Sequence, residues 1–275
     1  MKAMKISLVV LTILAAAVYG WLQVRDRLMT DRTPPILSFD SDTLTLSVRD
    51  DRSALLTGVR ASDDRDGDLS AEVMVRSVSQ LIDGSTAKVS YIVFDSSDNM
   101  GVASRTLVYS DYESPRFALS EQLIFPVGGS VKLQDRLTAT DVLDGDLTDA
   151  IRLSTDALNT YLEGNYRINV IVTNSMGDTV TLPLTVQIRT VTSQDPAINL
   201  TDQLIYLDLN AAFDPKRYLE SVQETASDAP SRDTSAVEIR SGVSTANAGV
   251  YEVYYTYENE QGRTATAILT VVVGA

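Results

Sequence analysis

The stretch YRINVIV (residues 166–172) has an apolar residue at every second position. Because successive side chains of a β-strand point to opposite faces, this alternation predicts a strand with one face in a hydrophobic core. The stretches AKVSYIV (residues 87–93) and YEVYYTY (residues 251–257) repeat the pattern. Three copies of one strand pattern indicate that the chain repeats a β-rich unit three times.

Four more segments are short, rich in β-branched or aromatic residues, and bounded by turn-forming residues. Many short strands with regular turns predict all-β sandwiches. After the N-terminus no sustained helical period occurs, although residues 216–224 could form a short helix. The spacing of the repeated strand divides the chain into modules at residues 33–111, 112–191 and 192–275. The four further strands are predicted at residues 43–48, 106–109, 181–188 and 267–273.

A second repeat is rich in aspartate: ASDDRDGDLS (residues 61–70) and ATDVLDGDLT (residues 139–148). Clustered carboxylates are oxygen ligands of the kind that Ca²⁺ takes, six to eight at a time. Asp95 and Asp98 on a later turn could add to the first cluster. The candidate metal ligands are Asp63, Asp64, Asp66, Asp68, Asp141, Asp144 and Asp146.

The same phrase also fits a tight turn that needs no ligand. Asp-Gly is a strong turn signal, and Asp side chains accept hydrogen bonds from backbone amides two residues on. The third module does not keep the phrase, since Ser231 and Arg232 stand where its first Asp and Gly would be. These features favour the turn, and they leave Ca²⁺ as the open alternative.

Composition excludes several classes of function. The chain has a formal net charge of −14 and neither Cys nor His. An acidic chain is poorly suited to bind nucleic acid, because phosphate contacts need a surplus of Lys and Arg. Without Cys and His there are no disulfides, thiolate or Ser-His-Asp catalysis, and hardly any zinc sites. Glycoside hydrolysis by paired carboxylates needs a cleft that three small sandwiches leave little chain to build, so we expect no enzyme.

The N-terminus is uncharged and apolar over residues 6–24, about the length that crosses the hydrocarbon core of a bilayer. A cleaved signal peptide is one interpretation, with residues 15–17 (AAA) at the cut. The apolar run continues beyond that point, which favours an uncleaved transmembrane helix. We therefore expect a short cytoplasmic tail at residues 1–5, a membrane anchor at residues 6–24 and a linker at residues 25–32.

The first two modules resemble the bacterial immunoglobulin-like surface repeat, a family of tandem modules in bacterial cell-surface proteins. The resemblance rests on the order of the Asp-Gly-Asp-Leu phrase, a strand with a central Tyr or Val, and a turn such as DSSDN at residues 95–99. The third module looks like a divergent member. The resemblance implies three tandem immunoglobulin-like β-sandwiches and an ectodomain outside the cell, behind one N-terminal transmembrane helix with a cytoplasmic N-terminus.

These observations predict a non-enzymatic, single-pass protein of the bacterial cell membrane. Its expected work is adhesion, spacing or scaffolding of envelope components, through an extracellular protein partner. Binding of polysaccharide or peptidoglycan is the alternative. No nucleic acid partner is expected, and Ca²⁺ is the one cofactor that remains open.

Overall fold

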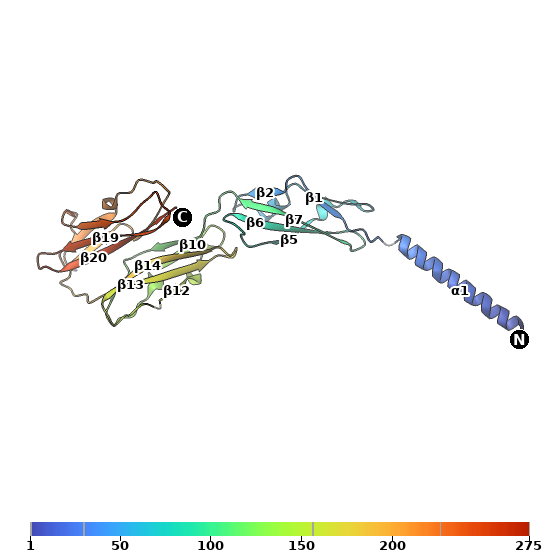
Figure 1. Cartoon of the computed structure of the whole chain (residues 1–275), viewed down its shortest axis with the longest axis horizontal. Coiled ribbons are helices and arrows are strands. Elements are labelled where there is room, and N and C mark those ends of the chain that lie inside the picture. Colours follow the sequence, from blue (N-terminus) through green and yellow to red (C-terminus); the bar gives the residue numbers. More distant parts are fainter. Residues whose placement is uncertain (1, 30, 156, 226, 275) are drawn as a thin grey trace. The chain divides into compact units, whose positions relative to one another are not determined.

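The computed structural model describes residues 2–29, 31–155, 157–225 and 227–274, and within the N-terminal helix it describes the side chains of residues 10–25. Met1, Thr30 and Ala226 belong to the predicted tail, linker and divergent third-module phrase, and they lie outside the described residues. The chain divides into two compact units, residues 1–111 and 112–275. Apart from the helix α1 (Lys2–Met29) and short 3₁₀ turns, the described chain is built from β-sheets (Figure 1).

The prediction of a membrane anchor at residues 6–24 is wrong. In the part of the chain that the structure describes, no helix is long and apolar enough to cross a membrane. The segment does form a helix, as part of α1. The predicted single-pass topology and membrane localisation are overturned with it.

The first sandwich lies in the first unit and has two sheets (Figure 1). In the larger sheet the order is β2-β7-β6-β5, with β2 parallel to β7 and the other neighbours antiparallel. Its strands are β2 (Thr43–Leu46), β7 (Met100–Tyr109), β6 (Thr86–Phe94) and β5 (Met74–Val78). The smaller antiparallel sheet has, in order, β1 (Ile36–Phe39), β3 (Val59–Asp63) and β4 (Gly67–Asp68).

The second sandwich opens the second unit and repeats this topology. Its smaller sheet has, in order, β11 (Gly145–Asp146), β10 (Leu137–Asp141) and β8 (Arg116–Leu119). Its larger sheet has, in order, β12 (Arg152–Ser154), β13 (Gly164–Thr173), β14 (Thr179–Arg189) and β9 (Ile124–Pro126). Strand β9 pairs in parallel with β14, as β2 does with β7.

The third sandwich keeps the larger sheet and loses one strand of the smaller. The larger sheet has, in order, β16 (Leu204–Leu207), β20 (Thr264–Val273), β19 (Gly249–Glu258) and β18 (Glu238–Ser241), again with a parallel first pair. The smaller sheet pairs β15 (Ala197–Leu200) with β17 (Leu219–Gln223). The larger sheets of the three sandwiches thus share one topology, and the module bounds 33–111, 112–191 and 192–275 stay a prediction.

The alternating apolar side chains from which the central strands were predicted lie in the cores of the sandwiches. Ile168, Val170 and Val172 are at most 2% exposed, and Val253 and Tyr255 are fully buried at the matching positions of the third sandwich. Burying these side chains stabilises each sandwich by roughly 1.5–3 kcal/mol per large apolar residue. The all-β prediction is confirmed.

The short helix expected at residues 216–224 is wrong in most of its length. Only the 3₁₀ helix η5 (Pro215–Tyr218) forms, capped by Asp214, whose carboxylate accepts a hydrogen bond from the amide of Lys216. The chain then enters β17, where Val222 is 3% exposed and pairs with Ile198 of β15. Burial of Val222 in the sheet therefore outweighs the local helical preference.

The second and third sandwiches pack against each other inside the second unit. Val272 of β20 belongs to the same apolar cluster as Leu184 and Ile188 of β14. The side-chain amide of Gln122 accepts a hydrogen bond from the Ile268 amide (2.9 Å) and donates one to the Ile268 carbonyl (3.1 Å). Strand β20 is thus buried on both faces, which agrees with its nearly continuous apolar sequence.

Candidate functional site

The repeated aspartate phrase builds the same loop in both copies. The Oδ1 atom of Asp63 accepts hydrogen bonds from the amides of Arg65 (2.9 Å) and Asp66 (3.0 Å). Asp141 holds the second loop in the same way, through the amides of Leu143 and Asp144. Such bonds from an Asp side chain to following amides are the chemistry of a tight turn.

Two further carboxylates of each loop tie it to its surroundings. Asp66 accepts hydrogen bonds from the backbone amide (2.7 Å) and the hydroxyl (2.9 Å) of Ser96, and Asp144 does the same with Ser175. The last Asp of each phrase accepts from the next Ser or Thr, for example Asp68 from the Ser70 amide at 2.9 Å. Three of the four carboxylates have the same partners in both copies, which agrees with a structural role in the loop. Asp146 accepts in this way from the Thr148 amide. The fourth carboxylate of the first copy, Asp64, is exposed, and Val142 stands at its place in the second copy.

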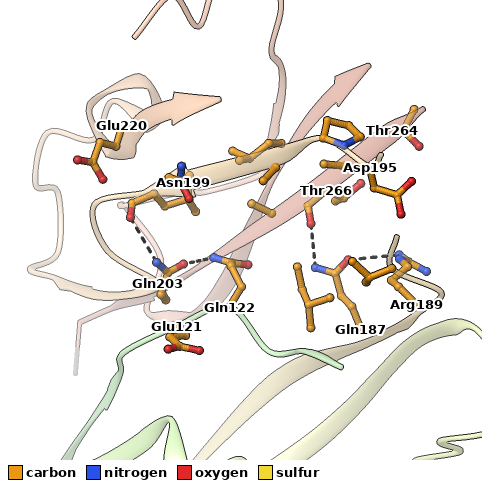
Figure 2. A pocket seen from close by; sticks show the side chains of 18 of the residues that line it. Glu121, Gln122, Gln187, Arg189, Asp195, Asn199, Gln203, Glu220, Thr264 and Thr266 are labelled. Carbon is orange, nitrogen blue, oxygen red and sulfur yellow. Dashed lines mark hydrogen bonds between the residues drawn. The ribbon is translucent and has the colours of Figure 1, made fainter. Parts of the chain in front are cut away.

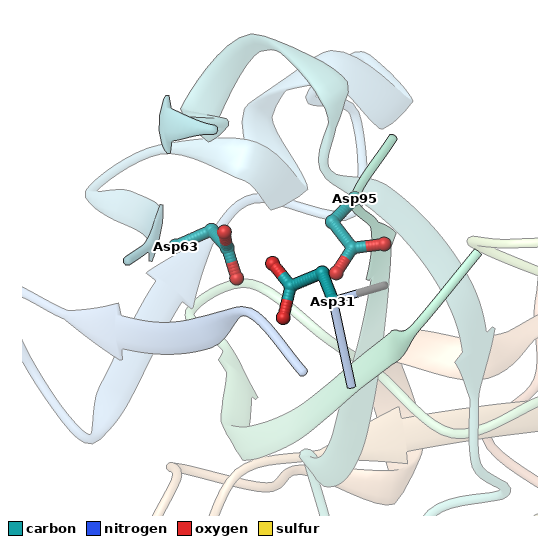
Figure 3. Close-up of side chains that lie close together, drawn as sticks. All are labelled: Asp31, Asp63 and Asp95. Carbon is teal, nitrogen blue, oxygen red and sulfur yellow. The ribbon is translucent and has the colours of Figure 1, made fainter. Parts of the chain in front are cut away.

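Of the seven predicted ligands, the structure brings one together with two carboxylates from outside the phrase. Asp31, Asp63 and Asp95 come from the segment before β1, the end of β3 and the turn after β6 (Figure 3). One carboxylate oxygen of each lies within 4.8 Å of the other two. In Figure 3 the three side chains point toward one another. We call this group the carboxylate triad.

The carboxylate triad contains oxygens that the protein does not satisfy. Within the described residues, the Oδ2 atoms of Asp31 and Asp63 are the buried side-chain atoms without a hydrogen-bond partner. The side chain of Asp31 is 5% exposed, and its other oxygen accepts a hydrogen bond from the Thr33 amide. The Nε atom of Arg65 lies 3.6 Å from Asp31 Oδ2, which is an ion pair but too long for a hydrogen bond.

At the equivalent place in the second sandwich, a neutral asparagine replaces one of the carboxylates, and the oxygen facing it accepts a hydrogen bond. Asn174 stands where Asp95 stands in the first sandwich, and its Oδ1 likewise accepts from two following amides, of Met176 and Asp178. Its Nδ2 donates to Asp141 Oδ2 (3.2 Å) and to the hydroxyl of Tyr112 (2.8 Å). The amide thus satisfies the oxygen that corresponds to the unpaired Oδ2 of Asp63.

The third sandwich also has an asparagine, Asn259, at this position of the turn. Asn259 accepts hydrogen bonds at Oδ1 from the amides of Gln261 and Arg263, as Asp95 and Asn174 do on their turns. Its Nδ2 donates to the backbone carbonyl of Glu224 (2.8 Å) and, at 3.4 Å, to that of Gln194. The first sandwich is therefore the one of the three that places a carboxylate oxygen where the others place an N–H donor.

Burial and hydrogen bonds at these turns shift the pKa values of Asp95 and Tyr112. Burial raises the pKa of Asp95, but hydrogen bonds from the Asn99 side chain and amide and from the Ser97 amide outweigh it, and the pKa lies below the ordinary value. Burial, with the hydrogen bond that it donates to Asp178, raises the pKa of Tyr112. Near neutral pH, Asp95 is therefore anionic and Tyr112 keeps its proton.

We expect the folded chain to lose stability in acid. Hydrogen bonds from the side chain and amide of Ser70 hold the pKa of Asp68 below its ordinary value, and Thr148 does the same for Asp146. A carboxyl whose pKa is lower in the folded state stabilises it above the unfolded pKa of ~3.9, and this contribution disappears as the pH falls through the folded pKa. The melting temperature, followed by circular dichroism, should fall below about pH 4, and less steeply in Asp68→Asn. An unchanged melting temperature down to about pH 2.5 would contradict this.

The second unit also contains a polar groove, shown in Figure 2, with a volume of about 630 Å³. It lies between the second and third sandwiches, where Gln187 of β14 donates a hydrogen bond to the Thr266 carbonyl of β20 (3.1 Å). Arg189 donates to Gln187 at 3.3 Å. Among the described residues that line the groove, none is aromatic. Its side-chain hydrogen-bonding groups include Glu121, Gln122, Asp195, Asn199, Gln203 and Glu220.

Comparison with known proteins gives a limited result. No family model matches the sequence. The chain is similar to the pesticidal crystal protein Cry22Aa of Bacillus thuringiensis, with 25% identity over 221 residues. The match covers 78% of this chain and 29% of that protein, so the chain spans less than a third of the relative's length.

Solved structures with some similarity are β-sandwich domains of two kinds. One is the CBM51-2 and INT structure of Clostridium perfringens ZmpB in complex with GlcNAc, with 17% identity and a TM-score of 0.23 over 54% of this chain and 26% of that one. Another is Drosophila N-cadherin EC1–4, with 13% identity and a TM-score of 0.22 over 89% and 76% of the two chains. No family model supports the particular bacterial repeat family that the sequence resembles.

Sequence analysis named Asp63 as a ligand and noted Asp95, but it assigned Asp31 to a linker. The structure instead buries the side chain of Asp31, which is 5% exposed. The chain that follows it packs closely on the sandwich, since a Cβ placed on Gly101 of β7 would lie 2.2 Å from the carbonyl oxygen of Pro35. The available signal was the contrast between the three turns, which carry Asp95, Asn174 and Asn259 at one position. A carboxylate at that position marks the first sandwich as different.

Proposed function

We propose that this chain works without catalysis, as an array of immunoglobulin-like modules that make protein–protein contacts in adhesion, spacing or scaffolding of envelope components. The observation that carries the proposal is the joining of the second and third sandwiches into one compact unit. A spacer must hold its ends at a fixed separation, and a packed, hydrogen-bonded contact between modules provides that.

The contact between these sandwiches combines apolar packing with directional bonds. Tyr206 of the third sandwich accepts a hydrogen bond from the Phe117 amide of the second at 2.9 Å. The hydroxyl of Thr185 donates to Glu252 at 2.6 Å. Removing several such bonds at once, each contributing about 1 kcal/mol, should loosen the contact without emptying either core.

The experiment compares the full chain with the double variant Gln122→Ala, Thr185→Ala. Small-angle X-ray scattering and NMR relaxation should show residues 112–275 of the parent chain tumbling as one body, and the two sandwiches of the variant tumbling more independently. Beads carrying the parent chain should retain envelope proteins in a protease-sensitive way, and beads carrying the variant should retain less. Independent tumbling in the parent chain, or retention that the variant leaves unchanged, would contradict the proposal.

Carbohydrate binding is the second candidate, favoured by the polar groove of the second unit. Sugar hydroxyls are recognised by convergent amide, carboxylate and guanidinium groups, which Gln187, Glu220 and Arg189 supply here. The described residues of the groove include none of the aromatic rings on which many sugars stack, so the protein-contact role ranks first. Retention of purified envelope polysaccharide by the beads, reduced in Glu220→Gln, would support this candidate; absence of retention would reject it.

A further inference from the structure

The carboxylate triad has an unbalanced charge. Asp31, Asp63 and Asp95 bring three negative charges into one partly buried place, and Arg65, 46% exposed and 3.6 Å from Asp31, returns one positive charge. Buried carboxylates are stable only when they are paired and hydrogen-bonded. The remaining charge of about minus two, with two Oδ2 atoms that accept no hydrogen bond, matches what one divalent cation would neutralise.

The other two sandwiches show what this place requires. Each has a positively polarised group there: the Nδ2 of Asn174 lies 3.2 Å from Asp141 Oδ2, and the Nδ2 of Asn259 lies 2.8 Å from the Glu224 carbonyl. At the same turn in the first sandwich stands Asp95, whose Oδ2 accepts a hydrogen bond from Asn99. This carboxylate oxygen has no proton to donate to Asp63. An external cation would do in the first sandwich what the asparagine amide does in the others.

We propose that Asp31, Asp63 and Asp95 form a Ca²⁺ site that fixes the segment before β1 to the end of the first sandwich. The proposal does not depend on the function proposed above, and it differs from the loop site expected from the sequence. Asp66, Asp68 and their counterparts in the second copy keep their roles in the loops.

The donor set fits calcium better than other biological cations. All the protein ligands are carboxylate oxygens, which suit hard cations, and no Cys or His is present in the chain. Two oxygens bound to one Ca²⁺ lie at most roughly 5 Å apart, and those bound to Mg²⁺ at most roughly 4 Å, from their metal–oxygen distances. The three oxygens, all within 4.8 Å of one another, fit inside the shell of one Ca²⁺ ion, whose remaining positions water or a second carboxylate oxygen would fill.

The site would connect three segments that are distant along the chain. Asp31 belongs to the stretch that passes over Gly101, while Asp63 and Asp95 lie on two loops that Asp66 and Ser96 already join. Without a cation, repulsion among the three carboxylates favours release of the stretch that has the fewest other bonds. The cation is thus expected to protect the amides of residues 31–35 from hydrogen exchange.

The first test is calcium titration of the chelator-treated full chain by isothermal titration calorimetry, up to about 10 mM, because weak protein Ca²⁺ sites have Kd values of ~0.1–1 mM. We expect one Ca²⁺ per chain, slower hydrogen exchange at residues 31–35, and a rise of several degrees in the melting temperature of the first unit at saturation. Mg²⁺ should bind at least ~10-fold more weakly, because it demands near-ideal octahedral geometry and gives up its water ligands reluctantly. Equal or tighter binding of Mg²⁺ would overturn the choice of calcium.

Matched variants locate the site. Asp31→Asn and Asp63→Asn should each weaken Ca²⁺ binding at least ~10-fold, because affinity follows the number of charged ligands. Asp141→Asn makes the same chemical change at the position of the second sandwich that corresponds to Asp63, and it should leave the Kd unchanged. Loss of binding in Asp141→Asn, or binding that survives in the Asp31→Asn, Asp63→Asn double variant, would overturn the assignment.

The variant Asp95→Asn distinguishes two roles of Asp95, that of a cation ligand and that of a residue that only stabilises the turn. It gives the first sandwich the amide that the other two have, so it should abolish Ca²⁺ binding and also raise the melting temperature measured in chelator. A structural aspartate would instead lower the melting temperature and leave calcium dependence in place. That result, or the absence of any saturable Ca²⁺ binding by the parent chain, would refute the proposal.

Discussion

Replacing Tyr91 by alanine should lower the free energy of unfolding of the first sandwich by about 4 kcal/mol, in the upper part of the range for buried aromatic residues. Tyr91 is fully buried in the centre of β6. Its hydroxyl donates a hydrogen bond to the Leu55 carbonyl (2.7 Å) and accepts one from the Nε atom of Arg105 (2.9 Å). The substitution would therefore open a cavity and also leave a buried guanidinium with one partner fewer.

Hydrogen exchange of the amides of β6 and β7 measures this effect, because it reports on the first sandwich separately from the rest of the chain. Tyr91→Phe keeps the ring and should lose about 1–2 kcal/mol, the contribution of the hydroxyl's bonds. The matched control is Ile92→Ala, the next residue along β6, which is half-buried on the opposite face and should lose about 1 kcal/mol. Equal losses in Tyr91→Ala and Ile92→Ala would contradict the role assigned to the tyrosine.

Arg105 also shows where sequence patterns fail within a strand. The sequence predicts a strand at residues 106–109, but β7 begins at Met100. Arg105 is 5% exposed, with its guanidinium 5.2 Å from the centre of the Phe39 ring and hydrogen bonds to the Leu55 and Thr57 carbonyls. A buried arginine breaks the apolar alternation, so a rule based on hydrophobic period starts the strand too late.

Predictions from sequence succeeded where the cause is local and failed where it is not. The alternation at residues 166–172 depends on neighbours in the chain, and the strand lies there. Asp31 meets Asp63 and Asp95 only after folding, so no spacing rule places them together. The continuous apolar run in β20 did carry a non-local signal: a strand buried on both faces needs a partner on each, and the second sandwich is that partner.

Replacing Asn174 by aspartate is the reverse of the Asp95→Asn substitution: it puts a carboxylate into the second sandwich where the first sandwich already has one. In Asn174→Asp, two carboxylates would face each other at about the 3.2 Å that now joins Asn174 Nδ2 to Asp141 Oδ2, and Tyr112 would have one proton to share between its two acidic neighbours. Both positions are at most 8% exposed. Creating an uncompensated buried charge should lower the free energy of unfolding of the second unit by about 3–5 kcal/mol at neutral pH.

The pH dependence of this variant should have the opposite sign to that of the parent chain. Repulsion between residues 141 and 174 raises the folded-state pKa of the pair above the unfolded value of ~3.9, so the variant regains stability as the pH falls from neutral toward ~4, where the pair shares a proton. Chemical denaturation at several pH values measures this. The control Asn169→Asp adds the same charge at an exposed position of β13, the strand just before Asn174, and should change stability by less than ~0.5 kcal/mol. If Asn174→Asp were no more destabilising than Asn169→Asp in the absence of calcium, the asparagine amide would not be what satisfies this place in the second sandwich, and the electrostatic argument for a cation in the first would fail with it.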